Sequence, residues 1–189
     1  PTQSHVNSME YITIAQTGNG VDFGDLTLTI VPGFTGSSPT RGIIAGGRET
    51  PNWYNNISYV TISTLGNVAD FGDMTVARSN HASSITNAVR MVMPGAVITP
   101  GGSYSNTIDY ITIATTGDAI DFGDQGSGEE ASASGSNSTR GVCFIGHDTA
   151  GNVLEHVQIM SSGNATDFGD LSAARRVYAA CSNGHGGLG

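Results

Sequence analysis

The chain has no lysine, and charged residues of either sign make up only 12% of its 189 residues. Seven arginines stand against sixteen acidic residues, so the formal net charge is −9. Nucleic-acid binding needs clusters of Lys and Arg that neutralise phosphates, and here only Arg175 and Arg176 are neighbours. We therefore expect no nucleic-acid partner.

Long hydrophobic stretches are also missing. No apolar run approaches the roughly 20 residues that a helix needs to cross a membrane, so we expect no membrane span. No basic segment followed by an apolar one opens the chain, which predicts the absence of a signal peptide.

Cysteine is scarce, with one residue in each of two expected strands, Cys143 and Cys181. We interpret both as free thiols, buried like small hydrophobic side chains. A disulfide would need their Cα atoms to lie within about 7 Å, and the sequence leaves that alternative open.

One four-residue motif, Asp-Phe-Gly-Asp, occurs four times. The copies are Asp22–Asp25, Asp70–Asp73, Asp121–Asp124 and Asp167–Asp170, at intervals of 48, 51 and 46 residues. A fixed period of this size indicates a repeat architecture. Eight of the sixteen acidic residues lie in these copies, so the acidity belongs largely to the repeat.

Each motif follows a segment with alternating polar and apolar residues, which is typical of a β-strand with two different faces. The four segments are residues 9–14, 57–62, 108–113 and 154–159. An Asn that suits a turn precedes each of them, at Asn7, Asn56, Asn106 and Asn152. Each unit has a further short apolar segment downstream, and no segment has helical periodicity. We therefore expect about four short strands in each unit and an all-β fold.

The repeat resembles the kelch family. Gly46-Gly47, Tyr59 and Phe71 follow one another in the order of the Gly-Gly pair, the Tyr and the later aromatic of a kelch unit. Phe replaces the kelch Trp, and His156 replaces the Tyr of the last unit. The resemblance implies a β-propeller of four four-stranded units of about 48 residues.

We expect one repeat domain over residues 1–189, with units at roughly 7–54, 55–104, 105–150 and 151–189. The chain opens at a Tyr strand, and Gly184–Gly189 looks like a shortened Gly-Gly strand. Pairing of N- and C-terminal strands would therefore complete a fourth unit and remove two sheet edges. A part in a larger ring and a combination of two chains are the alternatives.

The paired aspartates of the motif have two interpretations. We expect them to accept backbone hydrogen bonds at corners, with the four motif phenylalanines packing between units and with no cofactor. The alternative is Ca²⁺, which takes oxygen ligands. Its candidate ligands are Asp22, Asp25, Asp70, Asp73, Asp121, Asp124, Asp167 and Asp170. An i, i+3 pair needs a bulge to reach one face, and the intervening Gly permits one.

Other recurring charges receive structural interpretations. Arg41, Arg90 and Arg140 recur at one position, which predicts charge-assisted hydrogen bonds to the motif aspartates of neighbouring units. Three acidic residues recur immediately before the Tyr position and are expected on the solvent face: Glu10, Asp109 and Glu155. No histidine recurs at a fixed position and no Gly-x-Ser-x-Gly elbow is present, so we expect no enzyme.

Recognition is expected in the irregular segments between strands, because loops on a rigid scaffold often carry binding. The candidate loops are Val31–Pro39, Arg48–Asn56, Met93–Ser105 and Gln125–Thr139, the last containing a Ser-rich flexible insertion. Trp53 and Tyr54, placed in a loop at Thr50–Asn56, are the candidate ligand-binding aromatics.

Units with this Asp-Phe-Gly-Asp signature also resemble those in structural proteins of tailed bacteriophages. That resemblance implies a non-enzymatic component of the virion surface, such as a decoration, fibre or tail-associated protein, with an extracellular location. Its partners would be other virion proteins, further copies of itself, or host-surface glycans during attachment. The alternatives are a glycan-binding lectin acting alone and, less in keeping with the sequence, a propeller glycoside hydrolase.

Overall fold

A computed structural model describes residues 5–79, 83–98, 102–146, 151–175 and 179–182 of the chain. These residues form fourteen β-strands and include no helix, which confirms the all-β class. None of the described residues therefore forms a helix that could span a membrane.

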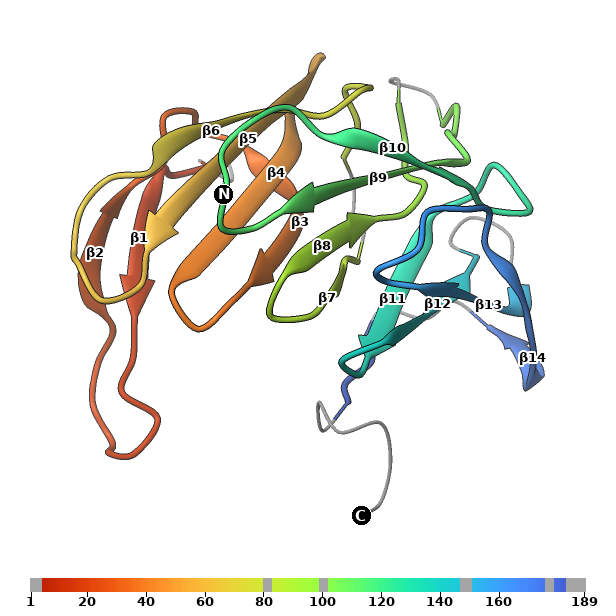
Figure 1. The fold of residues 1–189 in the computed structure, drawn as a ribbon. Helices are drawn as coiled ribbons and strands as arrows, with labels where there is room; N and C mark the ends of the chain where they lie inside the picture. The colour runs from red at the N-terminus through yellow and green to blue at the C-terminus, as the bar shows by residue number, and fades with distance from the viewer. Residues whose placement is uncertain (1–4, 80–82, 99–101, 147–150, 176–178, 183–189) are drawn as a thin grey trace.

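The strands form four antiparallel sheets that follow one another along the chain (Figure 1). The N-terminal sheet pairs β1 (Ser8–Tyr11) with β2 (Val21–Asp25). The second sheet has the order β3 (Val31–Ser37), β4 (Arg41–Glu49), β5 (Asn52–Thr61) and β6 (Ala69–Asp73).

The third and fourth sheets repeat the second. The third consists of β7 (Ile85–Thr86), β8 (Arg90–Met93), β9 (Thr107–Thr112) and β10 (Ile120–Asp124). The fourth consists of β11 (Ala131–Ser136), β12 (Arg140–Ile145), β13 (Gly151–Gln158) and β14 (Thr166–Arg175). Three sheets thus have the four strands expected of each unit, and every neighbouring pair is antiparallel.

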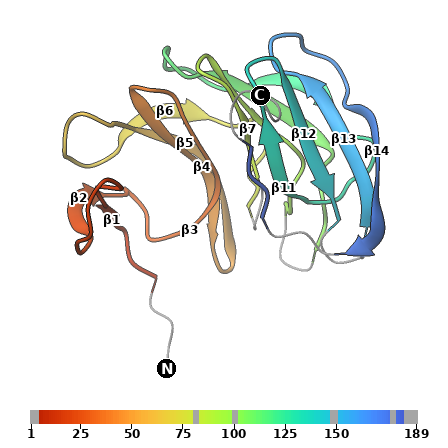
Figure 2. The same ribbon diagram turned by 90° about the horizontal axis from the view of Figure 1, so that it is seen from below.

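The two ends of the chain do not meet in one sheet. The N-terminal sheet and β14 lie at opposite ends of the row of sheets in both views (Figures 1 and 2). Gly184–Gly189, expected to pair with the N-terminal strands, lie outside the described residues. The nearby Ser182 bonds the backbone of Ser136 in β11. Within the described residues, no sheet closes by pairing strands from both termini.

The hydrophobic core lies between consecutive sheets. One buried cluster joins the second and third sheets and includes Phe34, Ile57, Phe71, Met91 and Ile111. The other joins the third and fourth sheets and includes Ile85, Val92, Ile108, Phe122, Cys143 and Val157. The second, third and fourth sheets therefore depend on one another for burial of their apolar faces.

Two segments expected to be loops contain strands. β3 occupies Val31–Ser37, and β11 runs through the Ser-rich segment that we expected to be flexible. The small residues of β11 fit closely against β7 of the third sheet: Ser134 Oγ donates to Ser84 O, just before β7, and Ser136 Oγ donates to Thr86 O. A composition that resembles a linker is here the consequence of close packing.

The turns expected at Asn56 and Asn152 are also absent, because β5 and β13 run through these residues. Asn55 takes the place equivalent to Asn7 and Asn106. Its carbonyl accepts the Met74 N–H at 2.7 Å, just as those of Asn7 and Asn106 accept the N–H groups of Leu26 and Gln125.

Candidate functional site: the junction between repeat units

All four Asp-Phe-Gly-Asp motifs contain a β-bulge. In each, the Gly and the first Asp pair with adjacent residues of the neighbouring strand, which leaves the Phe as the extra residue. The bulge that the sequence requires for an i, i+3 carboxylate pair is therefore present.

The outer edge of each motif then pairs with the next unit, forming what we call the junction. The carbonyl of Phe23 accepts the Gly66 N–H at 2.7 Å, and the carbonyl of Asp25 accepts the Val68 N–H at 3.0 Å. A side chain completes the pattern, because Asn67 Oδ1 accepts the Asp25 N–H at 2.9 Å.

The next two junctions have the same three hydrogen bonds. Phe71 and Phe122 accept from Gly117 and Gly163, both at 2.7 Å. The N–H groups of Asp73 and Asp124 are capped by the side chains of Asp118 and Asn164. One local sequence thus forms three equivalent contacts, and the Gly-Asn or Gly-Asp pair of the turn is as much a part of the motif as Asp-Phe-Gly-Asp.

The motif glycine is required by the closeness of the two backbones. Gly72 and Gly123 have φ values of 144° and 142°, which L side chains rarely adopt. A Cβ at Gly123 would lie 2.5 Å from the carbonyl carbon of Gly163. Only glycine satisfies both conditions at this edge.

Two of the four motif phenylalanines, Phe71 and Phe122, pack across a junction as expected, whereas Phe23 is half-buried and Phe168 is half exposed. Phe71 is 2% exposed and shares a cluster with Ile111 and Ile113 of the next sheet. Phe122 is 3% exposed and is clustered with residues of the fourth sheet. Each ring also meets the Tyr of its own unit edge-on, with centroids 6.0 Å apart for Tyr59–Phe71 and 5.9 Å for Tyr110–Phe122.

Two of the three recurring arginines reach the next unit, but our expectation of aspartate partners for them was wrong. Arg41 Nη1 donates to the carbonyl of Ile113 at 2.9 Å, and Arg90 Nη1 donates to that of Ile159 at 3.2 Å. Their Cζ atoms lie 4.4 Å and 4.2 Å from the ring centroids of Tyr59 and Tyr110. The aromatic ring takes the place of a carboxylate in positioning the cation.

Replacing Arg90 by Met should therefore lower the free energy of unfolding by about 1–2 kcal/mol, through loss of a charge-assisted hydrogen bond and a cation–π contact. Arg140→Met is the matched control, because Arg140 is exposed at the end of the row. Urea denaturation of the monomeric chain checks both. Equal losses would contradict the role given to Arg90.

Two of the three recurring acidic residues are buried, so the expected solvent-face position was wrong for them. Asp109 is 0% and Glu155 is 7% exposed, whereas Glu10 is exposed. Each buried carboxylate accepts hydrogen bonds from the residue that stands two positions after the last Asp of the preceding Asp-Phe-Gly-Asp motif. Thr75 bonds Asp109 through its N–H and hydroxyl, and the Gly126 N–H bonds Glu155 at 3.0 Å.

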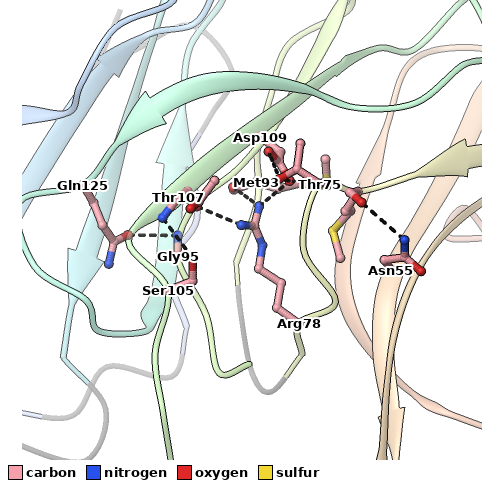
Figure 3. A network of polar contacts seen from close by, with 10 residues as sticks. Asn55, Thr75, Arg78, Met93, Gly95, Ser105, Thr107, Asp109 and Gln125 are labelled. Carbon is pink, nitrogen blue, oxygen red and sulfur yellow. Dashed lines mark hydrogen bonds and ion pairs between the residues drawn. The ribbon is translucent and has the colours of Figure 1, made fainter. Parts of the chain in front are cut away.

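Arg78 was not found by sequence reasoning, although it is central to the second junction (Figure 3). Its side chain is fully buried and forms a 3.0 Å ion pair with Asp109. It also donates to the carbonyls of Thr107 and Met93, at 2.9 Å and 3.0 Å. Burial lowers the pKa of Arg78, and the Asp109 carboxylate opposes that shift.

Gln125 binds the backbone of two nearby segments of the same chain, close to Arg78 (Figure 3). Its Oε1 accepts the Gly95 N–H at 2.9 Å, while its Nε2 donates to the carbonyl of Ser127 at 2.7 Å.

Glu155 lies at the third junction. Burial raises the pKa of its carboxyl group, while the hydrogen bond from the Gly126 N–H lowers it.

The structure does not gather the Ca²⁺ candidates into one centre. Seven of the eight motif aspartates are exposed, and Asp25 is half-buried. In the described part of the chain, no group of three or more His, Cys, Asp or Glu side chains has an arrangement that could hold a metal ion.

Trp53 and Tyr54 lie in a strand, so their expected loop position was wrong. Both belong to β5, where they pair with Arg48 and Gly47 of β4. Both side chains are half-buried. The loop expected at Arg48–Asn56 is largely this β4–β5 hairpin, because the strands extend almost to its tip.

Both cysteines are free, and Cys143 is buried as expected, but Cys181 is exposed, so the burial expected for it was wrong. Burial, with a contribution from the Glu155 charge, raises the pKa of Cys143 to about 12. Because the thiolate is the reactive form, one equivalent of maleimide should label the folded chain at neutral pH, at Cys181. Mass spectrometry of digested protein checks this, and labelling of Cys143 before unfolding would contradict its burial.

Comparison with known proteins adds no relative. No protein-family model matches the chain, and no curated protein sequence matches it.

Proposed function

We propose that this chain is a non-enzymatic structural and interaction protein whose units have a kelch-like propeller arrangement. The observation that carries the proposal is the recurrence of one junction at three places. The residues that define the repeat are used for pairing, capping and packing between units. Such use is typical of a scaffold whose variable surfaces bind partners.

Within that class, we propose a place on the surface of a tailed-phage virion, as a decoration, fibre or tail-associated component. The support is the resemblance of the Asp-Phe-Gly-Asp units to those of phage structural proteins. A lysine-free, hydroxyl-rich sequence of net charge −9 is in keeping with such a surface. In this role the protein needs neither a catalytic centre nor a cofactor.

The test is detection of the chain in purified particles of the phage whose genome encodes it. Antibodies raised against the recombinant chain should decorate particles in immunogold electron microscopy, and its peptides should occur in their proteome. An antibody against the major capsid protein serves as the positive control. Particles without label and without these peptides would contradict the virion assignment.

A further inference from the structure

Among the described residues, each end of the row of sheets presents half of a junction without the other half. At the N-terminal end, Gly18-Asn19 occupies the turn position of Gly66-Asn67. Ile14 is 95% exposed, although its counterpart Ile113 is 1% exposed within a junction. Ile12 is 66% exposed, and its counterpart Ile111 is 3% exposed. This end therefore has the exposed apolar residues and the Gly-Asn turn of a junction, but no Asp-Phe-Gly-Asp motif of the described residues packs against them.

The opposite end has the complementary half. Phe168 is 50% exposed, whereas Phe71 and Phe122 are 2% and 3% exposed. A Cβ built on Gly169 would meet no atom within 4 Å, in contrast to Gly123. The motif thus keeps its bulge and its aromatic pair with His156, but in the part of the chain that the structure describes nothing pairs with its outer edge.

The charges at the two ends also match a junction within the chain. Arg78 follows Asp73 by five residues and pairs with Asp109. Arg175 follows Asp170 by the same five residues, and Glu10 occupies the position of Asp109. Thr75, whose hydroxyl bonds Asp109, corresponds to Ser172.

Apart from the second junction, this combination occurs only at the two ends. At the first junction Ile30 stands where Arg78 does, and Ser58 stands where Asp109 does. At the third junction the corresponding residues are Glu129 and Glu155. Only the open ends repeat the pairing of a hydroxyl and a guanidinium with a carboxylate.

We propose that the C-terminal end of one copy docks on the N-terminal end of a second copy and forms a fourth junction. The Phe168–Asp170 edge pairs with the Gly18-Asn19 turn, and Phe168 covers Ile12 and Ile14. Arg175 and Ser172 bind the Glu10 carboxylate. The inference rests on the proposed role as an interaction protein, and it names the partner as a further copy of the chain.

The arrangement of the sheets favours a second copy over closure within one chain. The two faces lie at opposite ends of the row in both views (Figures 1 and 2). Leu171–Arg175 continue β14, and residues 172–175 are exposed. On docking, residues 171–175 would separate from the sheet and follow the path that residues 74–78 take after β6. Because residues 172–175 are exposed, this movement would not expose the hydrophobic core.

Such a contact joins two different surfaces and is therefore heterologous. Repetition of it produces a closed ring if the rotation between copies closes, and a filament if it does not. Either product is a homo-oligomer assembled through the same contacts that order the units inside each chain.

The test uses charge reversal at Glu10 and Arg175. Both residues are exposed, so Glu10→Arg and Arg175→Glu should leave the thermal midpoint of the dilute monomer unchanged. Each variant alone brings like charges together at the fourth junction and should weaken association by roughly thirtyfold or more. Phe168→Ser, which removes the aromatic anchor, should have the same effect by a separate route.

An equimolar mixture of the two charge variants supplies the decisive arm. In a filament or a ring with an even number of copies, every contact can then join unlike chains and pair opposite charges, so the mixture should recover the mass of the unaltered oligomer in size-exclusion chromatography with light scattering. For a ring with an odd number of copies, the Glu10→Arg/Arg175→Glu double variant pairs opposite charges at every contact and should recover that mass instead. The unaltered chain should show a multiple of 19.4 kDa.

Three results would overturn the inference. The first is an unaltered chain that stays monomeric at high concentration, and the second is single variants that associate normally. The third is a mixture that does not recover the oligomer, together with a Glu10→Arg/Arg175→Glu double variant that regains stability as a monomer. The last would show closure within one chain. A monomeric chain found in virions would refute this inference and leave the proposed function intact.

Discussion

Replacing Gly123 by Ala is expected to lower the free energy of unfolding by about 3 kcal/mol or more, the sum of two independent costs. A φ of 142° strains any residue with a Cβ by about 1–3 kcal/mol. The new methyl group would also lie 2.5 Å and 2.6 Å from the carbonyl carbon and oxygen of Gly163. These atoms belong to backbone, so relief requires the two sheets to separate, and overpacking typically costs about 1–3 kcal/mol.

Gly169→Ala separates the two costs. Gly169 has a comparable φ of 129°, but no atom lies within 4 Å of its Cβ position. In urea denaturation at concentrations where the chain is monomeric, this control should show the strain alone. A loss at Gly169 as large as that at Gly123 would mean that contact between sheets adds nothing at the motif glycine.

Replacing Asp109 by Ala should have a comparable effect, about 3–5 kcal/mol, because the change leaves the buried Arg78 guanidinium without its counter-ion. The backbone carbonyls of Thr107 and Met93 would still accept hydrogen bonds from Arg78, but they carry no full charge. The N–H and hydroxyl of Thr75 would lose their acceptor at the same time.

A double-mutant cycle tests this account of the buried pair. Arg78→Met combined with Asp109→Leu removes both charges and should cost less than the sum of the two single substitutions, since apolar pairs often replace buried ion pairs at little cost. Glu10→Gln is the positional control and should change the monomer by less than about 0.5 kcal/mol, because Glu10 is exposed. Strictly additive effects at residues 78 and 109 would contradict the coupling.

The repeat features that depend on local sequence could be predicted. The strands before each motif alternate in polarity, and the Gly within Asp-Phe-Gly-Asp permits the bulge that all four copies contain. Packing of Phe71 and Phe122 between units followed from the recurrence of a large aromatic at a fixed position.

The burial of Asp109 could not be predicted in the same way, because it depends on a neighbouring unit. Alternation of polar and apolar residues places Glu10, Asp109 and Glu155 on the same face of their strands. That face is buried only where the segment that follows the motif of the preceding unit packs against it. The spacing from Asp73 to Arg78 and from Asp170 to Arg175 was a usable signal, since it repeats within the chain.

The Ser-rich segment and the Trp53-Tyr54 pair were misplaced for a different reason. Both assignments to loops relied on composition, but the hydrogen bonds of β11 to β12 and of β5 to β4 depend on what lies opposite. Small side chains suit a strand pressed against another sheet, so composition alone does not distinguish such a strand from a linker.

The central claim is that the repeat motif joins each unit to the next, and native-state amide hydrogen exchange of the monomeric chain tests it most directly. The N–H groups of Gly66, Gly117 and Gly163 donate to the carbonyls of Phe23, Phe71 and Phe122. We predict strong protection of these amides, and rapid exchange at Gly18, the equivalent turn at the open N-terminal end. Rapid exchange at all four glycines would contradict the junction and, with it, the structural role of the repeat.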